Sequence, residues 1–330
     1  MEKIETQCKR LFKTSKRIYR EIKKNPSDIE KYIDFFTCLK EFQNLKKNTE
    51  DIADWSCEHS RLEWSPEMAE MHKINNELQV IIRREMRNER NISDLFDLYS
   101  RSLHIEAPWN FEQYMLYNEI DRAPEEKFYQ PRRKTLKQAV DALQDLEDDI
   151  LDELFLSQPP RTGKTTLMLM FITWHIGRHP LESNLYSACA DTLTKSFYNG
   201  ILEIMRDPFT YHWDKVFPGS PIVQTNANDE TINLLKKNRY PSLTCRSIDG
   251  SLNGSCDCTG IQIGDDFCSG IEEAKNKDRL ANLWGKVDNN YLTRAKSGSK
   301  KIWNGTRWSP FDPIGVRLEL LKTDKQFKNV

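Results

Sequence analysis

A short loop between two apolar stretches constrains the fold of this chain more than any other feature. Residues 154–157 form an apolar run of strand length, and the nearly apolar stretch 167–177 after the loop has helix length. Between them, Gly163, Lys164 and Thr165 stand directly before the expected helix. A loop between the end of a strand and the start of a helix turns its backbone amides toward a bound anion. The pattern therefore predicts a phosphate-binding loop at the carboxyl edge of a sheet.

The residues of this loop predict a site for ATP and Mg²⁺. Gly163 permits close backbone approach, Lys164 supplies charge for the β- and γ-phosphates, and the Thr165 hydroxyl is a Mg²⁺ ligand. The usual pattern G-x-x-x-x-G-K-[ST] begins with glycine, whereas this loop begins with Gln158. A chance Gly-Lys-Thr between a strand and a helix is therefore the alternative. The residues expected to contact the nucleotide are Gln158, Pro159, Pro160, Arg161, Thr162, Gly163, Lys164, Thr165 and Thr166.

Two acids follow an apolar run further along the chain. Residues 260–264 indicate a buried strand, and Asp265 and Asp266 come at its end. We expect this strand to lie beside the strand of the phosphate loop, where Asp265 reaches the Mg²⁺. Asp266 would then orient or deprotonate the water that attacks the γ-phosphate. Alone, the segment would be an ordinary strand with an acidic turn, but downstream of a phosphate loop it favours catalysis.

A third segment ends in small polar residues and an arginine. Residues 301–304 predict a strand, and Thr306 and Arg307 follow it. Such a strand end can sense the γ-phosphate and pass its loss to a moving domain. We therefore expect Thr306 and Arg307 to couple hydrolysis to motion, although by itself the segment would be a strand and a turn.

The chain changes character near residue 105, which predicts a helical region at 1–104 and an ATPase domain at 105–330. Helical patterns follow one another in the first region, and a third long pattern covers 66–90. The first apolar stripe consists of Ile4, Cys8, Leu11, Ser15, Ile18 and Ile22, and the second of Ile29, Ile33, Phe36 and Leu39.

From residue 107 on, strand and helix signals alternate. This alternation predicts an α/β fold, a mainly parallel sheet covered by helices on both faces. Helices are expected at 107–120, 134–146 and 191–205, and strands at 154–157, 184–187, 243–248, 260–264 and 301–304.

The overall charge does not indicate a nucleic-acid binder. The formal net charge is −1 and the pI is about 6.6, so contact with DNA would depend on local patches. One such patch is residues 1–24, where nine Lys and Arg stand against three Glu. We favour a solvated helix face there over a contact with DNA or an acidic partner.

No signal peptide or membrane span is expected, so we predict a soluble, intracellular protein. The eight cysteines then indicate reduced thiols. A zinc site is a minor alternative, because the spacing is C-x-C and no histidine lies close in sequence. The cysteines concerned are Cys245, Cys256, Cys258 and Cys268.

Together, these motifs resemble the ATPase domain of the large terminase subunit of tailed phages, a DNA-packaging motor. The resemblance covers roughly residues 107–321. It implies a P-loop NTPase fold of the ASCE/RecA-like class, and it accounts for Gln158, since terminase loops commonly depart from glycine there. The markers are Phe128-Tyr129-Gln130-Pro131-Arg132-Arg133, the loop 157–165, Gly264-Asp265-Asp266, Glu272-Glu273-Ala274, Thr306-Arg307-Trp308 and Asp312-Pro313.

The resemblance also implies residue roles. Arg161 would be a cis-acting arginine at the γ-phosphate, and Asp265 would hold Mg²⁺. Asp266 stands where many relatives carry a catalytic Glu. It is shorter, and Glu272 is a distant second choice. Arg132 belongs to a segment that would contact the adenine base.

A trans-acting arginine is less clear from the resemblance. Many relatives carry an arginine in the loop before the acidic strand, whereas residues 252–255 here are Leu-Asn-Gly-Ser. Arg246 or Arg294 would then be the source of such an arginine.

The implied function is ATP hydrolysis that drives translocation of double-stranded viral DNA into a procapsid, in the cytoplasm of an infected bacterial host. The implied partners are duplex DNA, the portal protein, the small terminase subunit and further copies of this chain in a ring, with no membrane. Relatives normally continue into an RNase H-like nuclease domain, whereas this chain ends at Val330. We therefore expect no nuclease activity from it.

Two other functions stay open: a helicase-like or remodelling ATPase, and a non-catalytic nucleotide-binding assembly module. No unwinding motif is found, and the acid pair argues against an inactive module. A translocating motor would grip DNA phosphates through local cations, although a solvated loop explains the same runs. The runs are Arg294, Lys296, Lys300 and Lys301, and Lys236, Lys237 and Arg239.

Overall fold

The structure is a computed structural model that describes residues 2–49, 64–88, 92–250 and 256–323. The chain forms two compact units, Met1–Gln130 and Pro131–Val330. The first unit includes residues 105–130, which the sequence analysis assigned to the ATPase domain. No helix in the described residues is both long enough and apolar enough to cross a membrane.

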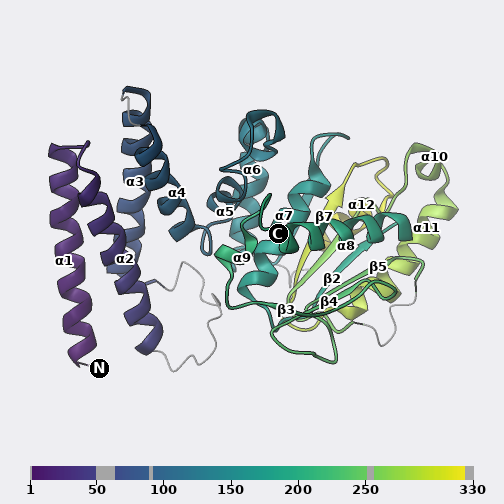
Figure 1. Cartoon of the computed structure of the whole chain (residues 1–330). Coiled ribbons are helices and arrows are strands. Elements are labelled where there is room, and N and C mark those ends of the chain that lie inside the picture. Colours follow the sequence, from purple (N-terminus) through teal and green to yellow (C-terminus); the bar gives the residue numbers. More distant parts are fainter. Residues whose placement is uncertain (1, 50–63, 89–91, 251–255, 324–330) are drawn as a thin grey trace. The chain divides into compact units, whose positions relative to one another are not determined.

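The first unit is helical, as predicted for the N-terminal region (Figure 1). The buried stripe expected for the first helix is confirmed from Cys8 to Ile22, and Ile4 is half-buried. The elements are α1 (Glu2–Lys24), α2 (Ile29–Thr49), α3 (Pro66–Asn88), α4 (Ile92–Glu106), α5 (Phe111–Asn118) and a 3-10 turn at Pro124–Glu126.

Two details of this unit differ from the prediction. Ile33 was placed in the apolar stripe of α2, but it is 39% exposed. Aromatic residues at i, i+3 and i+4 bury more surface, and they turn the helix so that Tyr32, Phe35 and Phe36 face the core. The helix expected from residue 107 begins at Phe111, because the Asn110 side chain accepts a hydrogen bond from the backbone of the first turn.

The second unit is a seven-stranded, mostly parallel sheet flanked by helices. It contains α6 (Tyr129–Glu147, whose first two residues belong to the first unit), β1 (Glu153–Ser157), α7 (Lys164–Arg178), β2 (Asn184–Ala188), α8 (Asp191–Arg206), α9 (Trp213–Val216), β3 (Ile222–Asn226), β4 (Thr231–Leu234), β5 (Leu243–Ser247), β6 (Ile261–Asp265), α10 (Ile271–Ala274), α11 (Lys277–Lys286), a π-helical turn (Val287–Tyr291), a 3-10 turn (Leu292–Arg294), β7 (Lys300–Gly305) and α12 (Pro313–Thr323).

The strand order is β1-β7-β6-β2-β5-β4-β3. The strands β1, β7, β6, β2 and β5 pair in parallel, which confirms the predicted parallel sheet. The expectation that β6 lies directly beside β1 is wrong, because β7 pairs with both and lies between them. The antiparallel hairpin of β3 and β4 at the sheet edge was not predicted.

Helices cover both faces of the sheet. α7 contacts β7, and α8 contacts β2 and β5, on one face. The connections from β1 to β2 and from β2 to β5 move along the sheet in one direction, and the connection from β6 to β7 moves in the other. A right-handed crossover therefore places α11 on the opposite face from α7 and α8. There, Leu280 and Leu283 of α11 pack in one buried cluster with Trp303 of β7.

Candidate functional site

The loop between β1 and α7 has the backbone of an anion-binding turn. Arg161 and Gly163 have positive φ angles of 67° and 94°, and α7 begins at the next residue, Lys164. The Thr162 hydroxyl donates to the Pro159 carbonyl at 2.9 Å and lies 3.2 Å from Oε1 of Gln158. Left-handed residues directly before a helix turn successive amide groups to one side, which is the geometry of a phosphate loop.

Lys164 points its amino group into the edge of the sheet, and the residue is only 7% exposed. Its Nζ donates to Oγ1 of Thr306 at 2.6 Å and to the Gln158 carbonyl at 3.3 Å. It also lies 3.6 Å from Oδ1 of Asp266. The loop lysine therefore connects the phosphate loop with the ends of β6 and β7.

Asp265 is held at the end of β6 by three side chains. Its Oδ2 accepts from Tyr186 at 2.8 Å and from Thr165 at 3.3 Å, and its Oδ1 accepts from Asn304 at 2.7 Å. Burial raises the pKa of Asp265 to about 6 and the charge of Asp266 acts in the same direction, whereas these hydrogen bonds lower it. The carboxylate is thus buried with neutral donors as its nearest partners.

The donor set around Asp265 fits Mg²⁺. A hydroxyl and a carboxylate oxygen lie 3.3 Å apart, between Thr165 and Asp265, and oxygen atoms are the ligands that Mg²⁺ prefers. A cation there would also offset the charge that burial disfavours. Thr165 is exposed, so the pair can be reached from solvent.

Asp266 occupies a tight turn after β6. Its φ is 40°, a left-handed conformation that aspartate tolerates better than most residues. Its Oδ1 accepts from the Thr306 backbone at 3.1 Å, and its own N–H donates to the Asn304 carbonyl at 2.9 Å. The side chain is 39% exposed. Asp266 therefore joins β6 to β7 while it remains accessible.

Thr306 is the residue at which the three predicted motifs meet. The sheet register sets Ser157 opposite Gly305 and Asp265 opposite Asn304, so the residue after β7 falls between the ends of β1 and β6. Its hydroxyl contacts Lys164 and donates to the Gln158 carbonyl at 3.3 Å.

Arg307 turns away from this meeting point toward α12. Its Nε bonds the Asp312 carboxylate at 3.0–3.1 Å, and its NH2 group donates to the Ser309 carbonyl. Asp312 is buried and also accepts from three backbone amides, those of Trp308 and Ser309 in the loop before α12 and that of Gly315 in its first turn. The segment after Thr306 is therefore fixed to the first turn of α12.

The structure does not bring all predicted residues together. Arg161 is exposed and forms no hydrogen bond or ion pair with any described residue, and Pro159, Pro160 and Thr166 are also exposed. Glu272 is 82% exposed and pairs with Lys275 at 2.7 Å on α10. Arg132 is exposed near the start of α6. Glu272 takes no part in the hydrogen bonds and ion pairs that join the described residues around Thr306.

The two candidate trans-acting arginines differ in their surroundings. Arg246 is bound to Asp229 at 2.8 Å, whereas Arg294 is half-buried in a short turn, where it contacts Thr293. Residues 252–255, which carry no arginine, lie outside the described residues.

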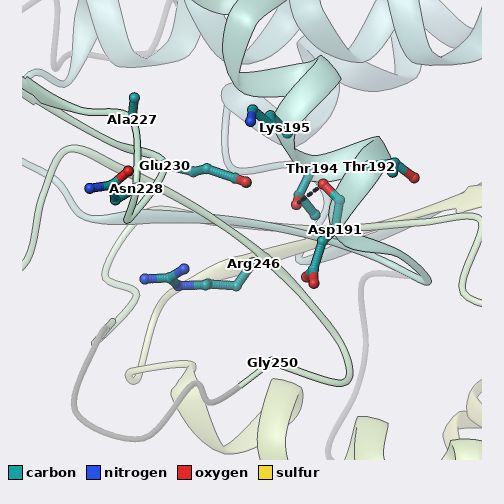
Figure 2. Close-up of a pocket in the computed structure, with 9 residues that line it drawn as sticks. All are labelled: Asp191, Thr192, Thr194, Lys195, Ala227, Asn228, Glu230, Arg246 and Gly250. Carbon is teal, nitrogen blue, oxygen red and sulfur yellow. Dashed lines mark hydrogen bonds between the residues drawn. The ribbon is translucent and has the colours of Figure 1, made fainter.

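Arg246 lines a pocket of about 650 Å³ at the start of α8 (Figure 2). Lys195 and Arg246 contribute positive charge to its lining, and Glu230 and Asp191 contribute negative charge. Because β2 and β5 are parallel to β1 and β6, the pocket opens on the same edge of the sheet as the phosphate loop. Its lining consists of Asp191, Thr192, Thr194, Lys195, Ala227, Asn228, Glu230, Arg246 and Gly250.

The cysteines do not form the zinc site considered from the sequence. Burial raises the pKa of Cys256 to about 11 and that of Cys245 and Cys258 well above the usual range. Among the described residues, the group with metal-ligand side chains close together is instead Glu147, His175 and His179.

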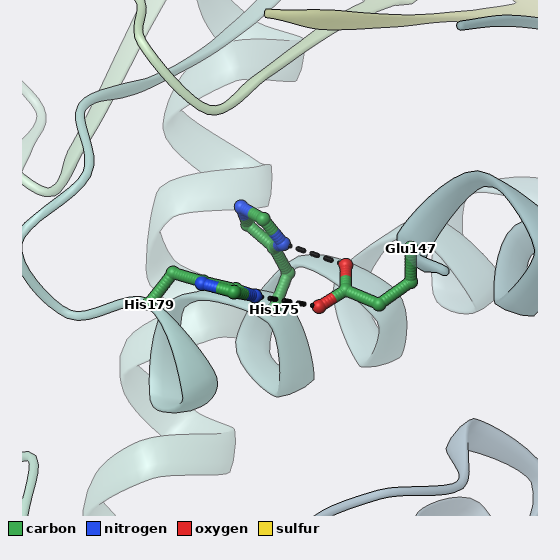
Figure 3. A group of neighbouring side chains, drawn as sticks. All are labelled: Glu147, His175 and His179. Carbon is green, nitrogen blue, oxygen red and sulfur yellow. Dashed lines mark hydrogen bonds and ion pairs between the residues drawn. The ribbon is translucent and has the colours of Figure 1, made fainter. Parts of the chain in front are cut away.

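This group is a closed ion network (Figure 3). The two oxygens of Glu147 bond different rings at 2.8 Å, those of His175 and His179. Arg178 lies 3.4 Å from the same carboxylate, and Glu182 lies 3.3 Å from the far nitrogen of His175. A guanidinium so close to the carboxylate supplies the charge that a metal ion would bring, so the arrangement favours internal ion pairing.

The basic runs considered as DNA contacts are partly neutralised. Lys296 pairs with Asp257 and Lys300 with Asp149, each at 2.7 Å, and Lys301 is half-buried on β7. Lys236, Lys237 and Arg239 are exposed after β4, and Arg239 lies over the Tyr240 ring.

Two residues of the site were not foreseen, Tyr186 and Asn304. Both lie inside predicted strands. The strand pattern predicts only which side chains are buried, so it gave neither residue a role in the site. The available signal was a hydrogen-bonding side chain near the carboxyl end of each parallel strand, the edge at which ligands bind in such sheets.

A comparison of the chain with models of known protein families found no match, and a comparison with curated proteins found none either.

Proposed function

We propose that this chain is a Mg²⁺-dependent P-loop ATPase of the ASCE/RecA-like class that drives double-stranded viral DNA into a procapsid. The observation that carries the ATPase part is the convergence on Thr306, where the loop lysine and the acid after β6 meet. The DNA-packaging part rests on the resemblance of the motifs to the large terminase subunit.

The proposed roles follow from the contacts. Lys164 would exchange its contacts with Thr306 and Gln158 for phosphate oxygens, and Thr165 and Asp265 would hold Mg²⁺. Mg²⁺-ATP brings the scissile phosphoanhydride and much of the charge neutralisation. Asp266 would orient or accept a proton from the attacking water, and Arg161 is free to turn toward the nucleotide.

Thr306 and Arg307 would carry the state of the site to the rest of the unit. Thr306 contacts Lys164 directly, and Arg307 is fixed to α12 through Asp312. When the γ-phosphate leaves, Lys164 would lose its phosphate contact, and the surroundings of Thr306 would change. Arg307, the next residue, would pass this change to α12.

The wider assembly belongs to the same proposal. Duplex DNA, the portal protein, the small terminase subunit and further copies of this chain in a ring are its partners, in the cytoplasm of the infected bacterium. Arg246 or Arg294 would act in a neighbouring site, and Arg246 would first have to release Asp229.

Steady-state ATP hydrolysis tests the proposal. We expect the Mg²⁺-dependent rate of the unaltered chain to fall to background in Lys164→Ala and to rise on addition of duplex DNA. Lys137→Ala is the matched control, because Lys137 is exposed on α6 and pairs with Asp141. Equal rates for the unaltered chain and Lys164→Ala at high protein concentration would contradict catalysis at this site.

One observation favours a second candidate, the nucleotide-binding assembly module. Oδ1 of Asp266 already accepts from the Thr306 backbone and lies near Lys164, which limits its use as a base. ATP binding that requires Lys164, without turnover at any protein or DNA concentration, would decide for this candidate.

A further inference from the structure

Helix α1 carries a line of cations opposite its buried face. Arg10, Lys13, Arg17, Arg20 and Lys24 are all exposed and are spaced three and four residues apart. At 3.6 residues per turn, they occupy an arc of about 80° centred roughly 160° from the buried stripe, and they extend over about 21 Å. We call these five residues the cationic stripe.

The stripe has little internal neutralisation. Among the described residues, Arg10, Lys13, Arg20 and Lys24 enter no ion pair. Arg17 is 72% exposed and lies 3.8 Å from Glu21, which Lys31 also approaches. Like charges at i, i+3 and i+4 repel one another, so the folded helix holds an unfavourable arrangement that a polyanion would relieve.

The remaining cations of the helix differ from the stripe. Lys9, Lys16 and Lys23 lie along its flank, and they pair with Glu5, Glu70 and Glu77 respectively. Their acidic partners lie on α1 and α3, whereas the one such contact of the stripe among the described residues is the 3.8 Å approach of Arg17 to Glu21 on its own helix.

We propose that the cationic stripe of α1 binds the phosphate backbone of duplex DNA. A protein partner would be expected to meet apolar or aromatic anchors, and no large hydrophobic residue of α1 is exposed. Single-stranded nucleic acid would be expected to meet exposed aromatic rings, and Phe12 and Tyr19 are both half-buried in the core cluster. A straight row of charges alone suits the regular backbone of a duplex.

The contact would be independent of sequence and sensitive to salt. Neutralising five phosphates gives a log–log salt dependence with a slope of about −4.5, or roughly a 500-fold loss of affinity between 50 and 200 mM salt. The proposed function supplies the duplex, but the stripe would bind it without nucleotide.

Fluorescence anisotropy of a 30-base-pair duplex with the full chain, measured without nucleotide, tests this inference. Lys13→Gln, Arg17→Gln and Arg20→Gln together should reduce the magnitude of the salt slope by about three. The matched control is Lys9→Gln, Lys16→Gln and Lys23→Gln together, which removes the same charge from the same helix and should leave the slope nearly unchanged. Circular dichroism verifies that both variants stay helical.

Equal weakening by the two triple variants would overturn the inference, since net charge alone would then explain binding. Duplex binding that is unchanged in the stripe variant would also overturn it. If that variant instead lost binding to poly-glutamate, the partner of the stripe would be an acidic protein surface. Lys164→Ala should bind the duplex normally, so failure of this inference is distinguishable from failure of the ATPase proposal.

Discussion

Helix α7 has a buried carboxylate near each of its ends. Asp265 lies beside Thr165 at the start of the helix, and Glu147 lies beside His175 and His179 at its end. Burial raises the pKa of Asp265 to about 6. Burial acts in the same direction on Glu147, but the charges of His175, Arg178 and His179 outweigh it and hold that pKa well below the usual range.

The difference lies in the partners. Glu147 is surrounded by cations of the last turn of α7, where positive charge also complements the helix dipole. Asp265 has hydroxyl and amide donors as its nearest partners, and the nearby Thr165 is exposed. Glu147 is paired with cationic side chains of the protein and therefore contributes to stability. Asp265 has neutral nearest partners and is therefore suited to bind a cation such as Mg²⁺.

The largest expected effect is at the Glu147 end. Glu147→Ala should lower the free energy of unfolding by about 3–5 kcal/mol, because it leaves the buried His175 and Arg178 without their counter-charge. Urea unfolding measures the change. Asp141→Ala on the same helix is the control, since the exposed pair with Lys137 is worth about 1 kcal/mol or less. If both variants lost a similarly small amount of unfolding free energy, the buried ion network would contribute no more than an exposed ion pair.

Asp265→Asn is expected to change the free energy of unfolding in the opposite direction. The pKa of Asp265 is raised from 3.8 to about 6, so ionisation costs stability as the pH rises through this window. At pH 7 the substitution should therefore raise the free energy of unfolding by about 1–3 kcal/mol. Mg²⁺-dependent hydrolysis should fall roughly 100-fold or more. A loss of stability like that of Glu147→Ala would show that the two carboxylates are alike.

The smallest expected effect is a pH dependence at the Glu147 end. The pKa of His175 is raised from 6.5 to about 9 although burial acts against it, because Glu147 and Glu182 face the ring. A raised histidine pKa stabilises the fold below 6.5, and this contribution is lost as the pH rises through about 9. The free energy of unfolding should therefore fall by about 1–3 kcal/mol from pH 6.5 to 9.5.

His175→Gln should remove most of that slope, whereas His212→Gln in the same unit should keep it. Urea unfolding of each variant at several pH values measures the change of unfolding free energy with pH. Arg178 and His179 also contact Glu147, so part of the pH dependence remains in His175→Gln. An unchanged slope in His175→Gln would assign the pH dependence to other groups.

Sequence patterns predicted the strands of the parallel sheet to within one or two residues, because each is a short segment with at least two apolar residues that a helix or a turn follows. The β3–β4 hairpin was missed, since its edge strand is half-exposed and carries polar residues such as Gln224 and Asn226. Period-2 and apolar-run signals are weak in such strands.

The site was predictable as a set of motifs, but its internal arrangement was not. Strand order depends on tertiary packing, so the position of β7 between β1 and β6 had no local signal. Thr306 was expected to couple hydrolysis to motion, whereas its contacts with Lys164 and Asp266 follow only from that order. The Glu147 network was missed, although two histidines four residues apart at a helix end share one face.

Because β7 lies between β1 and β6, the number of residues in β7 is tightly constrained. Deleting one residue from β7 (Lys300–Gly305) would turn the side chains on one side of the deletion to the opposite face of the sheet. Thr306 would then lose Gln158, Lys164 and Asp266 in a single step. Residues added to the loop 235–242, between β4 and β5, leave the pairing of β1, β7 and β6 unchanged and cost little loop entropy.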